Sequence, residues 1–373
     1  MKNKINIIQF TPYFPPHKWW LETVAEEIWE HWVKQKYGDF INVTFSIGQE
    51  DWILDYEKDG YRVLVIPAFD IVPNFPIPKI WDKKFWNILK EIKNIIWDRK
   101  EDFRIITHTR FFLSSFIWGL FAIKNKVNWI HLEHGSWYVK LSSRFKSKVA
   151  YFYDRFIWKW IFKSTNKVLV ISGACEKFIH KDFIEREVEV FYRGLDFPEA
   201  WKEKNGDIKI VFVGRLVWLK WVTHLIEPYR ELGIKNELII IGDGEEKESL
   251  EKQAEGAENI SFLWFQNRDF VLDYLKKNNC IFVNPSYQEG MPTTVMEALF
   301  YWNVAIATDV WGTTEISDED DLIIIQPWNE DELWKSIKIA LDWYKNLAWK
   351  SKGTISKRFS RDRNITKLYE LIK

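Results

Sequence analysis

Cysteine is almost absent from this chain of 373 residues, and its scarcity excludes several classes of protein. Cys175 and Cys280 stand far apart without the spacing of a metal site, so we expect two buried thiols in a reducing compartment. Basic and acidic residues balance at 53 each, so no overall charge attracts nucleic acid. These features argue against a disulfide-stabilised, zinc-binding or nucleic-acid-binding protein.

Long hydrophobic runs are also missing. The longest, over residues 111–123, is shorter than a bilayer requires and contains two serines and a glycine. Residues 1–10 pass directly into an apolar strand pattern, without the charged, then apolar, then small residues of a secretory signal. We therefore expect a cytoplasmic protein. Its 47% hydrophobic content is enough for two substantial cores, and its length favours two domains.

Glycine is scarce as well. The chain has 16 glycines, where an average usage of roughly 7% predicts about 26, whereas tryptophan occurs 23 times. Glycine normally supplies positive φ angles and close backbone approach, neither of which suits an indole. The positions of the tryptophans therefore matter for any function assigned to the chain.

Apolar strand patterns alternate with amphipathic helix patterns, which predicts an α/β fold with two doubly wound, Rossmann-like domains. A strand over 5–10, a proline-rich loop and a helix over 21–33 form the opening βα unit. The remaining predicted strands are 43–47, 63–67, 104–107, 129–133, 167–172, 209–213, 237–241, 260–263, 280–283, 303–308 and 322–325.

The alternation pauses once and then restarts, which places a domain boundary. We predict a first domain over 1–190, a linker over 191–206 and a second domain over 207–357. The final predicted helix, within 358–373, has no partner left in the second sheet. No repeat of solenoid period and no low-complexity tract interrupts this organisation.

Two glutamates eight positions apart mark the most informative segment. Glu289 follows a predicted strand, and the Gly290-Met291-Pro292 turn separates it from a predicted helix that contains Glu297. The N–H groups of the first helical turn, at Thr293 and Thr294, point back at the loop. An anion is the natural ligand for such a helix start.

This segment resembles the Glu-x7-Glu element of the retaining, nucleotide-sugar-dependent glycosyltransferases of family four, which have the GT-B fold. Other segments are similar to family elements in the same order along the chain. They are 15–17 with 21–22, 133–136, Gly214 to Leu216 with Lys220, 241–244 and 312–315. The resemblance implies two facing domains with a ligand cleft and a C-terminal helix that crosses back to the first domain.

The resemblance also implies roles for particular residues. Glu289 reads the sugar hydroxyls or steadies a developing positive centre, and Glu297 accepts from the ribose hydroxyls. Arg215 and Lys220 hold the diphosphate and neutralise the departing nucleotide. His134 reaches the donor sugar from the first domain, with His17 a weaker candidate. The further donor-binding residues are Gly290, Met291, Pro292, Thr293, Thr294, Gly214, Trp19 and Trp20.

No cofactor beyond the nucleotide-diphosphate sugar is expected, and no metal. No Asp-x-Asp metal pair is evident, because the acidic run 318–321 is interpreted as a solvated turn. The family's usual Asn is replaced by Arg193 in the interdomain turn. We assign no general base, because retention in this family is attributed to a front-face route in which the leaving phosphate takes the acceptor proton.

Several tryptophans stand where relatives typically carry glycine. They are Trp19, Trp20, Trp221, Trp264, Trp302, Trp311 and Trp328. A tryptophan-rich core and a sugar-stacking surface are two interpretations. We favour a third, in which UGA codons that the source cell reads as glycine have been translated as tryptophan. A true Trp19-Trp20 pair would fill the space that the donor diphosphate needs.

The segment 140–163 mixes seven basic residues and several aromatics with a single acid, Asp154. Such a helix suits an anionic membrane surface, but it equally suits an ordinary amphipathic helix that covers the sheet. Together with the family's frequent use of lipid-linked acceptors, this segment favours a peripheral membrane protein at the inner face of the plasma membrane.

The sequence thus predicts a metal-independent, retaining hexosyltransferase that acts on a glycan or lipid-linked acceptor in cell-surface polysaccharide biosynthesis. Two alternatives stay open. One is a GT-B-like sugar-nucleotide epimerase, and the other is a non-enzymatic, tryptophan-faced carbohydrate-binding protein. Neither the donor base, the donor sugar nor the acceptor follows from the sequence.

Overall fold

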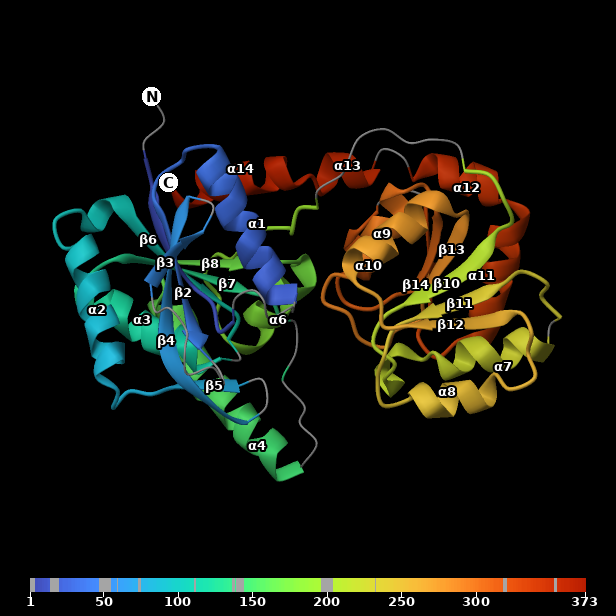
Figure 1. The fold of residues 1–373 in the computed structure, drawn as a ribbon, viewed down its shortest axis with the longest axis horizontal. Coiled ribbons are helices and arrows are strands. Elements are labelled where there is room, and N and C mark those ends of the chain that lie inside the picture. The colour runs from blue at the N-terminus through green and yellow to red at the C-terminus, as the bar shows by residue number, and fades with distance from the viewer. Residues whose placement is uncertain are drawn as a thin grey trace. The chain divides into compact units, whose positions relative to one another are not determined.

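The computed structural model divides the chain into two compact units, Met1–Gly194 with Arg361–Lys373 and Leu195–Ser360 (Figure 1). We call them unit 1 and unit 2. The first division falls inside the predicted linker 191–206. The structure describes residues 4–13, 20–46, 55–58, 60–72, 75–110, 112–135, 138, 144–195, 204–231, 233–317, 321–351 and 354–373.

Unit 1 contains a mainly parallel sheet with the order β3-β4-β2-β1-β6-β7-β8-β9, and β5 pairs with β4. Only β3 and β5 run antiparallel, each paired with β4. The strands are β1 (Asn6–Phe10), β2 (Phe40–Ser46), β3 (Asp55–Lys58), β4 (Tyr61–Val72), β5 (Phe75–Pro78), β6 (Phe103–His108), β7 (Asn128–Glu133), β8 (Lys167–Val170) and β9 (Glu189–Val190).

Helices cover both faces of this sheet. One core joins alternate strand residues to α1 and α14, and the opposite core joins the intervening residues to α2, α3 and α5. The helices are α1 (Trp20–Lys34), α2 (Lys83–Ile96), α3 (Leu113–Asn125), α4 (Arg144–Tyr153), α5 (Lys159–Ser164), α6 (Gly173–Asp182) and α14 (Arg361–Ile372), with η1 (Lys100–Asp102) and the π-helical η2 (Asp154–Trp158). The predicted return of the C-terminal helix to the first domain is confirmed, because α14 packs beside α1 (Figure 1).

Unit 2 contains an all-parallel sheet with the order β12-β11-β10-β13-β14-β15. Its strands are β10 (Lys209–Val213), β11 (Leu238–Ile241), β12 (Ile260–Trp264), β13 (Cys280–Asn284), β14 (Val304–Thr308) and β15 (Leu322–Ile325). The central strands β10, β13 and β14 read as apolar runs because helices bury both faces of the sheet.

The helices of unit 2 form two layers on this sheet. Residues of α7, α8, α11 and α12 join one core, whereas α10 contacts β13, β14, α9 and α13. The helices are α7 (Thr223–Glu231), α8 (Lys247–Gln253), α9 (Arg268–Lys277), α10 (Thr293–Phe300), α11 (Glu330–Asp342), α12 (Tyr344–Lys350) and α13 (Thr354–Arg358), with η3 (Trp218–Lys220) and η4 (Thr313–Glu315).

Three local predictions differ from the structure. The strand predicted over 167–172 ends at Val170, because Ser172 accepts a hydrogen bond from the Cys175 N–H at 3.2 Å and caps α6. The basic segment 140–163 is helical from Arg144 onward but is not a regular α-helix, since the π-helical turn η2 joins α4 to α5. The strand predicted over 63–67 extends to 61–72, where its antiparallel partners β3 and β5 lengthen it.

Candidate active site

The loops that carry the predicted donor residues meet at the switch point of the unit 2 sheet. The chain proceeds from β10 outward to β12 and then returns to the other side of β10 as β13. Ligands bind outside the carboxyl ends of the strands at such a point. The loop after β10 carries Arg215 and Lys220, and the loop after β13 carries Glu289.

Lys220 and Glu289 form the centre of this site. The Lys220 ammonium is paired with Glu289 Oε1, and the two side chains are 18% and 13% exposed. The same oxygen accepts from the Asn284 side-chain amide at 3.2 Å, and Asn284 in turn accepts from the Ser286 hydroxyl at 2.8 Å. The Tyr287 N–H donates to the Leu219 carbonyl at 2.8 Å and ties the two loops together. The carboxylate is therefore held in one place.

Glu297 lies about one turn into α10, whose start is predicted to bind an anion. Pro292 precedes α10, and the Val295 and Met296 N–H groups bond back to its carbonyl at 3.2 and 3.4 Å. Glu297 is buried, and Arg268 at the start of α9 donates to its Oε1 at 3.0 and 2.9 Å from Nε and Nη2. Arg268 was not predicted, because α9 is brought to α10 only by the fold.

Two glycines hold the neighbouring loops of unit 2 at van der Waals distance. A Cβ on Gly242, whose φ is +151°, would lie 1.8 Å from the Gly214 carbonyl oxygen. A Cβ on Gly244 would lie 2.3 Å from the Leu216 carbonyl oxygen. The Leu216 N–H also donates to the Asp243 carbonyl at 2.8 Å. The loop after β10 is thus positioned by the loop after β11. Arg215, which lies between Gly214 and Leu216 in the loop after β10, is exposed.

In unit 1 the switch point lies between β1 and β6, and the predicted residue His134 follows the adjacent strand β7. The fully buried Glu133 organises this edge of the sheet. It accepts from the Arg110, His134 and Gly135 N–H groups at 3.0, 3.0 and 2.6 Å. The Arg110 guanidinium lies 3.4 Å from the same carboxylate. Within the predicted motif 133–136, Glu133 is therefore a structural residue that fixes the backbone of His134 and Gly135.

The ionisation of this cluster follows from its surroundings. Burial acts to raise the pKa of Glu133, but Arg110, His131 and the Gly135 N–H outweigh it and hold that pKa below its usual value. Burial, aided by His131, lowers the pKa of His108 to about 3. Burial and the nearby His108 lower the pKa of His134 well below its usual value. Both imidazoles are neutral at physiological pH, and Glu133 is charged.

Unit 1 is expected to lose stability below pH 6.5. An unfolded histidine binds a proton near that pH, whereas folded His108 and His134 do not, so acid favours the unfolded chain. At pH 5.5 His108 contributes about 1.4 kcal/mol less stability than at pH 7.5, and His134 adds to this loss. Denaturant unfolding at both pH values measures the loss, and His108→Gln should reduce it by about 1.4 kcal/mol. An unfolding free energy independent of pH between 5.5 and 7.5 would contradict the burial of neutral histidines.

Several predicted residues lie outside the described part of the chain. These are His17, Trp19, residues 136–137 and Lys140. Trp20 opens α1, but its side chain is also outside the described residues. Arg193, predicted in the interdomain turn, belongs to unit 1, where its guanidinium pairs with Glu27 at 2.9 and 3.1 Å. Within the described residues, no group of three or more His, Cys, Asp or Glu side chains could hold a metal ion.

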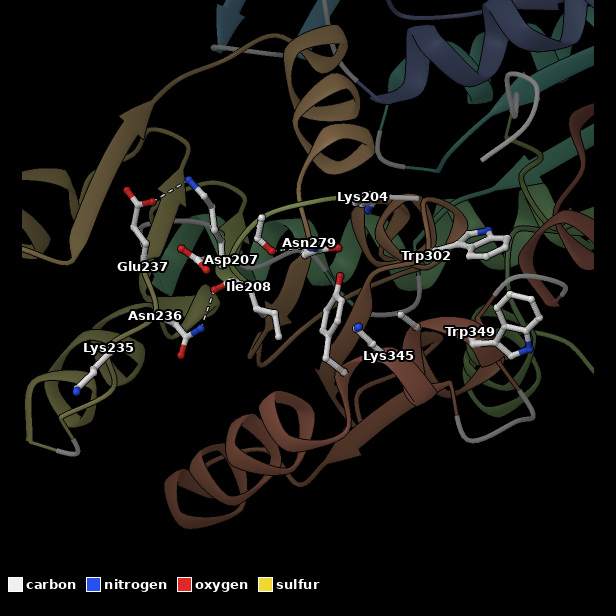
Figure 2. Close-up of a pocket in the computed structure, with 14 residues that line it drawn as sticks. Lys204, Asp207, Ile208, Lys235, Asn236, Glu237, Asn279, Trp302, Lys345 and Trp349 are labelled. Carbon is white, nitrogen blue, oxygen red and sulfur yellow. Dashed lines mark hydrogen bonds and ion pairs between the residues drawn. The ribbon is translucent and has the colours of Figure 1, made fainter. Parts of the chain in front are cut away.

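A cavity of about 1110 Å³ in unit 2 lies away from the switch point. Its lining includes Lys209, Glu237 and Asn279, which stand at or just before the amino ends of β10, β11 and β13 (Figure 2). Lys209 and Glu237 pair at 2.8 Å. Because this is the opposite end of the parallel sheet from Glu289, the cavity is not part of the site described above.

A doubly wound unit whose switch point carries two ion-paired carboxylates and a helix start has the arrangement at which open α/β sheets bind ligands. Comparison with known proteins gives the family: this chain belongs to the glycosyltransferases, with Glycosyl transferases group 1 matching residues 196–353 and Glycosyltransferase Family 4 matching residues 21–197. The predicted family and the GT-B fold are confirmed.

Relatives cover between about half and most of the chain, and solved structures cover almost all of it. An uncharacterised glycosyltransferase of Methanocaldococcus jannaschii is 33% identical over 84% of this chain and 83% of its own length. An N-acetylgalactosaminyltransferase of Campylobacter jejuni that acts on an undecaprenol-linked diphospho-sugar is 28% identical over 56% of this chain and 55% of its own. Anabaena HepE, solved with UDP and glucose, superposes with a TM-score of 0.73 at 14% identity over 99% of each chain.

Proposed function

We propose that this glycosyltransferase moves a hexose, with retention and without a metal, from a nucleotide-diphosphate sugar to a glycan or lipid-linked acceptor in cell-surface polysaccharide biosynthesis. The Lys220–Glu289 pair at the switch point of unit 2 is the observation that carries the proposal. Supporting it, relatives include an O-antigen glycosyltransferase of Escherichia coli and a putative teichuronic acid glycosyltransferase of Bacillus subtilis.

Each residue of the site has a role in this reaction. Arg215 and Lys220 neutralise the diphosphate as the bond to the sugar breaks, with the N–H groups at the start of α10 as further donors. Glu297, oriented by Arg268, accepts from the ribose hydroxyls. Glu289 accepts from the sugar hydroxyls. When the sugar binds, Lys220 exchanges its carboxylate partner for the phosphate.

A panel of nucleotide sugars tests the proposal, with binding followed by calorimetry in the presence of a chelator. One donor is expected to bind, and Lys220→Met should weaken binding by roughly tenfold or more, since a charge-assisted contact contributes about 1.5–3 kcal/mol. Lys209→Met, which removes an equally paired lysine at the other end of the sheet, should leave binding unchanged.

The products of the bound donor decide the reaction class. Transfer to an added acceptor with an unchanged anomeric configuration supports the proposal. NMR of the product shows both whether the sugar was transferred and which anomer was formed. A nucleotide sugar returned as its epimer would support the epimerase instead. A transfer rate that depends on a divalent cation would contradict the proposal that the reaction needs no metal.

We also propose that unit 1 docks on an anionic membrane through an exposed face of α4, η2 and α5. This basic-aromatic face consists of Lys148, Tyr151, Phe152, Arg155, Phe156, Lys159 and Lys163. Phe152 and Phe156 are 59% and 69% exposed and stack on each other, whereas the one acid, Asp154, is buried. Figure 1 shows α4 extending outward from unit 1. Among the described helices, none is long and apolar enough to cross a membrane.

Flotation with phosphatidylglycerol vesicles measures this docking. Removing two charges by Arg155→Gln and Lys159→Gln should weaken binding about 30-fold, at about 1 kcal/mol per charge. The control Lys83→Gln with Lys84→Gln removes two exposed charges from α2 and should have no effect. Equal binding to neutral phosphatidylcholine vesicles would overturn the proposal.

A further inference from the structure

A chain of buried hydrogen bonds crosses the strands of unit 1 and ends at His134. His134 Nε2 lies 3.1 Å from His108 Nδ1, and His108 Nε2 lies 3.0 Å from the Gln9 side-chain oxygen. The Gln9 amide nitrogen donates to the Ala25 carbonyl in α1 and to Asn42, at 3.2 Å each. Gln9, Asn42 and His108 are fully buried.

The Ala25 carbonyl sets the direction of the whole chain. A carbonyl only accepts, so the Gln9 nitrogen must face it and the Gln9 oxygen must face His108. The Gln9 oxygen also only accepts, so the proton of His108 lies on Nε2. A neutral imidazole has one N–H, which leaves His108 Nδ1 as the acceptor for His134 Nε2–H.

We propose that Gln9 and His108 are positioning residues that hold His134 in one tautomer, with its proton on Nε2 and with Nδ1 as the acceptor nitrogen. The part that this ring takes in transfer rests on the proposed function. The assignment of the proton rests on the hydrogen-bond geometry of unit 1 alone.

The low proton affinity of the two histidines supports this arrangement. Burial keeps the pKa of His108 at about 3 and that of His134 well below its usual value, so neither imidazole gains the second proton that would reverse the chain. A second buried chain ends at the neighbouring carboxylate: Trp129 donates to Thr107, Thr107 bonds to His131, and His131 lies 3.3 Å from Glu133. None of these side-chain hydrogen bonds is shared by the chain that reaches His134 and the chain that reaches Glu133.

Nitrogen-15 spectra of histidine-labelled protein read the tautomer without any substrate. The expected result is an unprotonated Nδ1 and a protonated Nε2 on His134 between pH 6 and 8. Gln9→Leu removes the acceptor of His108 and should produce a mixture of both tautomers. Asn6→Leu removes a partly buried hydrogen bond that Asn6, in the same strand, accepts from the Asp39 N–H, and it should leave the tautomer unchanged.

Two results would overturn the assignment: a protonated Nδ1 in the unaltered protein, or a tautomer that Gln9→Leu does not change. These spectra need no donor, so failure of every nucleotide sugar to bind counts against the proposed function and leaves the tautomer measurement valid.

An independent observation concerns the tryptophans. Among the described residues, eight other than glycine have a positive φ, and five of them are tryptophans. These are Trp221 (56°), Trp264 (51°), Trp302 (56°), Trp311 (49°) and Trp328 (67°). The left-handed conformation costs roughly 1–2 kcal/mol for a residue with a Cβ, and only glycine, asparagine and aspartate adopt it routinely. Nothing in an indole favours this backbone.

Other tryptophans of the chain behave differently. Trp32 in α1 and Trp129 in β7 are buried on regular backbone, and their indole N–H groups donate to the Ile5 carbonyl at 3.0 Å and to Thr107 at 2.9 Å. Trp221 is 3% exposed, and its indole N–H is buried with no hydrogen-bond partner among the described residues. The five tryptophans with positive φ thus differ from Trp32 and Trp129 in backbone conformation. Trp221 differs from them also because its indole N–H has no hydrogen-bond partner among the described residues.

We infer that Trp221, Trp264, Trp302, Trp311 and Trp328 are glycines in the polypeptide that the source cell makes, encoded by UGA codons. Their backbone already has the conformation that glycine supplies at turns. Trp302 lines the cavity of about 1110 Å³ in Figure 2, so glycine there would remove part of its wall.

Peptide mass spectrometry of the protein isolated from the source cells decides the matter. Peptides that span residues 302 and 311 should have the mass of glycine at both positions, and tryptophan masses would overturn the inference. In recombinant protein, replacing the two exposed tryptophans Trp311 and Trp328 by glycine should raise the melting temperature of unit 2, by roughly 2 °C or more per site. Trp32→Gly and Trp129→Gly should lower that of unit 1. A double variant that melts at the same temperature or below also counts against the inference.

Discussion

Replacing Glu289 by glutamine is expected to lower kcat by about 10²–10³, the loss typical of removing one preorganised electrostatic contact at a reacting centre. Glu289 is mostly buried, and Lys220 and Asn284 hold it in place. The amide keeps the shape of the side chain but loses the charge that pairs with Lys220 and accepts from sugar hydroxyls. Steady-state transfer assays with the donor from the binding panel measure the effect.

The matched control for this variant is Glu237→Gln. Glu237 pairs with Lys209 at 2.8 Å, but it stands at the amino ends of the strands and is 39% exposed. Surface pairs of this kind contribute about 0–1 kcal/mol, so activity and stability should both stay close to those of the unaltered protein. Equal activity of Glu289→Gln and Glu237→Gln would exclude a role for Glu289 in transfer.

Replacing Glu133 by glutamine is expected to destabilise unit 1 by about 3–5 kcal/mol, the cost of leaving a buried charge without its partner. The carboxylate accepts from three backbone N–H groups and faces the Arg110 guanidinium. A glutamine would place N–H groups against these donors. Urea unfolding, with a probe in unit 1, measures the loss.

Glu133→Asp provides the comparison, because it keeps the charge and shortens the side chain. It should destabilise unit 1 less than Glu133→Gln does. The transition of unit 2 should be unaffected by either change, because Glu133 and all its partners belong to unit 1. An unfolding free energy of Glu133→Gln within 1 kcal/mol of the unaltered protein would show that the buried acid does not organise this edge.

The positions of most strands could be predicted, because buried parallel strands are apolar runs between turn residues. The prediction missed β3 (Asp55–Lys58), β5 (Phe75–Pro78) and β9 (Glu189–Val190). The first is polar and lies at the edge of the sheet, the second contains two prolines, and the third has only two residues. Such strands produce no apolar run, so only their pairing with β4 or β8 identifies them.

The partners of the site residues could not be predicted in the same way. Arg268, Gln9 and His108 each lie in ordinary helix or strand sequence, distant along the chain from the residues that they orient. The one available signal was a polar side chain within a buried strand, at Gln9 in β1 and His108 in β6. Buried polar groups require partners, but the sequence does not say which.

By itself, the sequence determined the alternation of strands and helices, the order of the loops that carry charge, and the odd placement of tryptophan at turns. The tertiary structure alone decided that β10 lies beside β13, which brings Lys220 to Glu289 across 69 residues. It also decided that a carbonyl of α1 orients a chain of hydrogen bonds ending at His134. The physical reason is that hydrophobic periodicity encodes which face of an element is buried, whereas the lateral order of parallel strands depends on how their crossover helices pack.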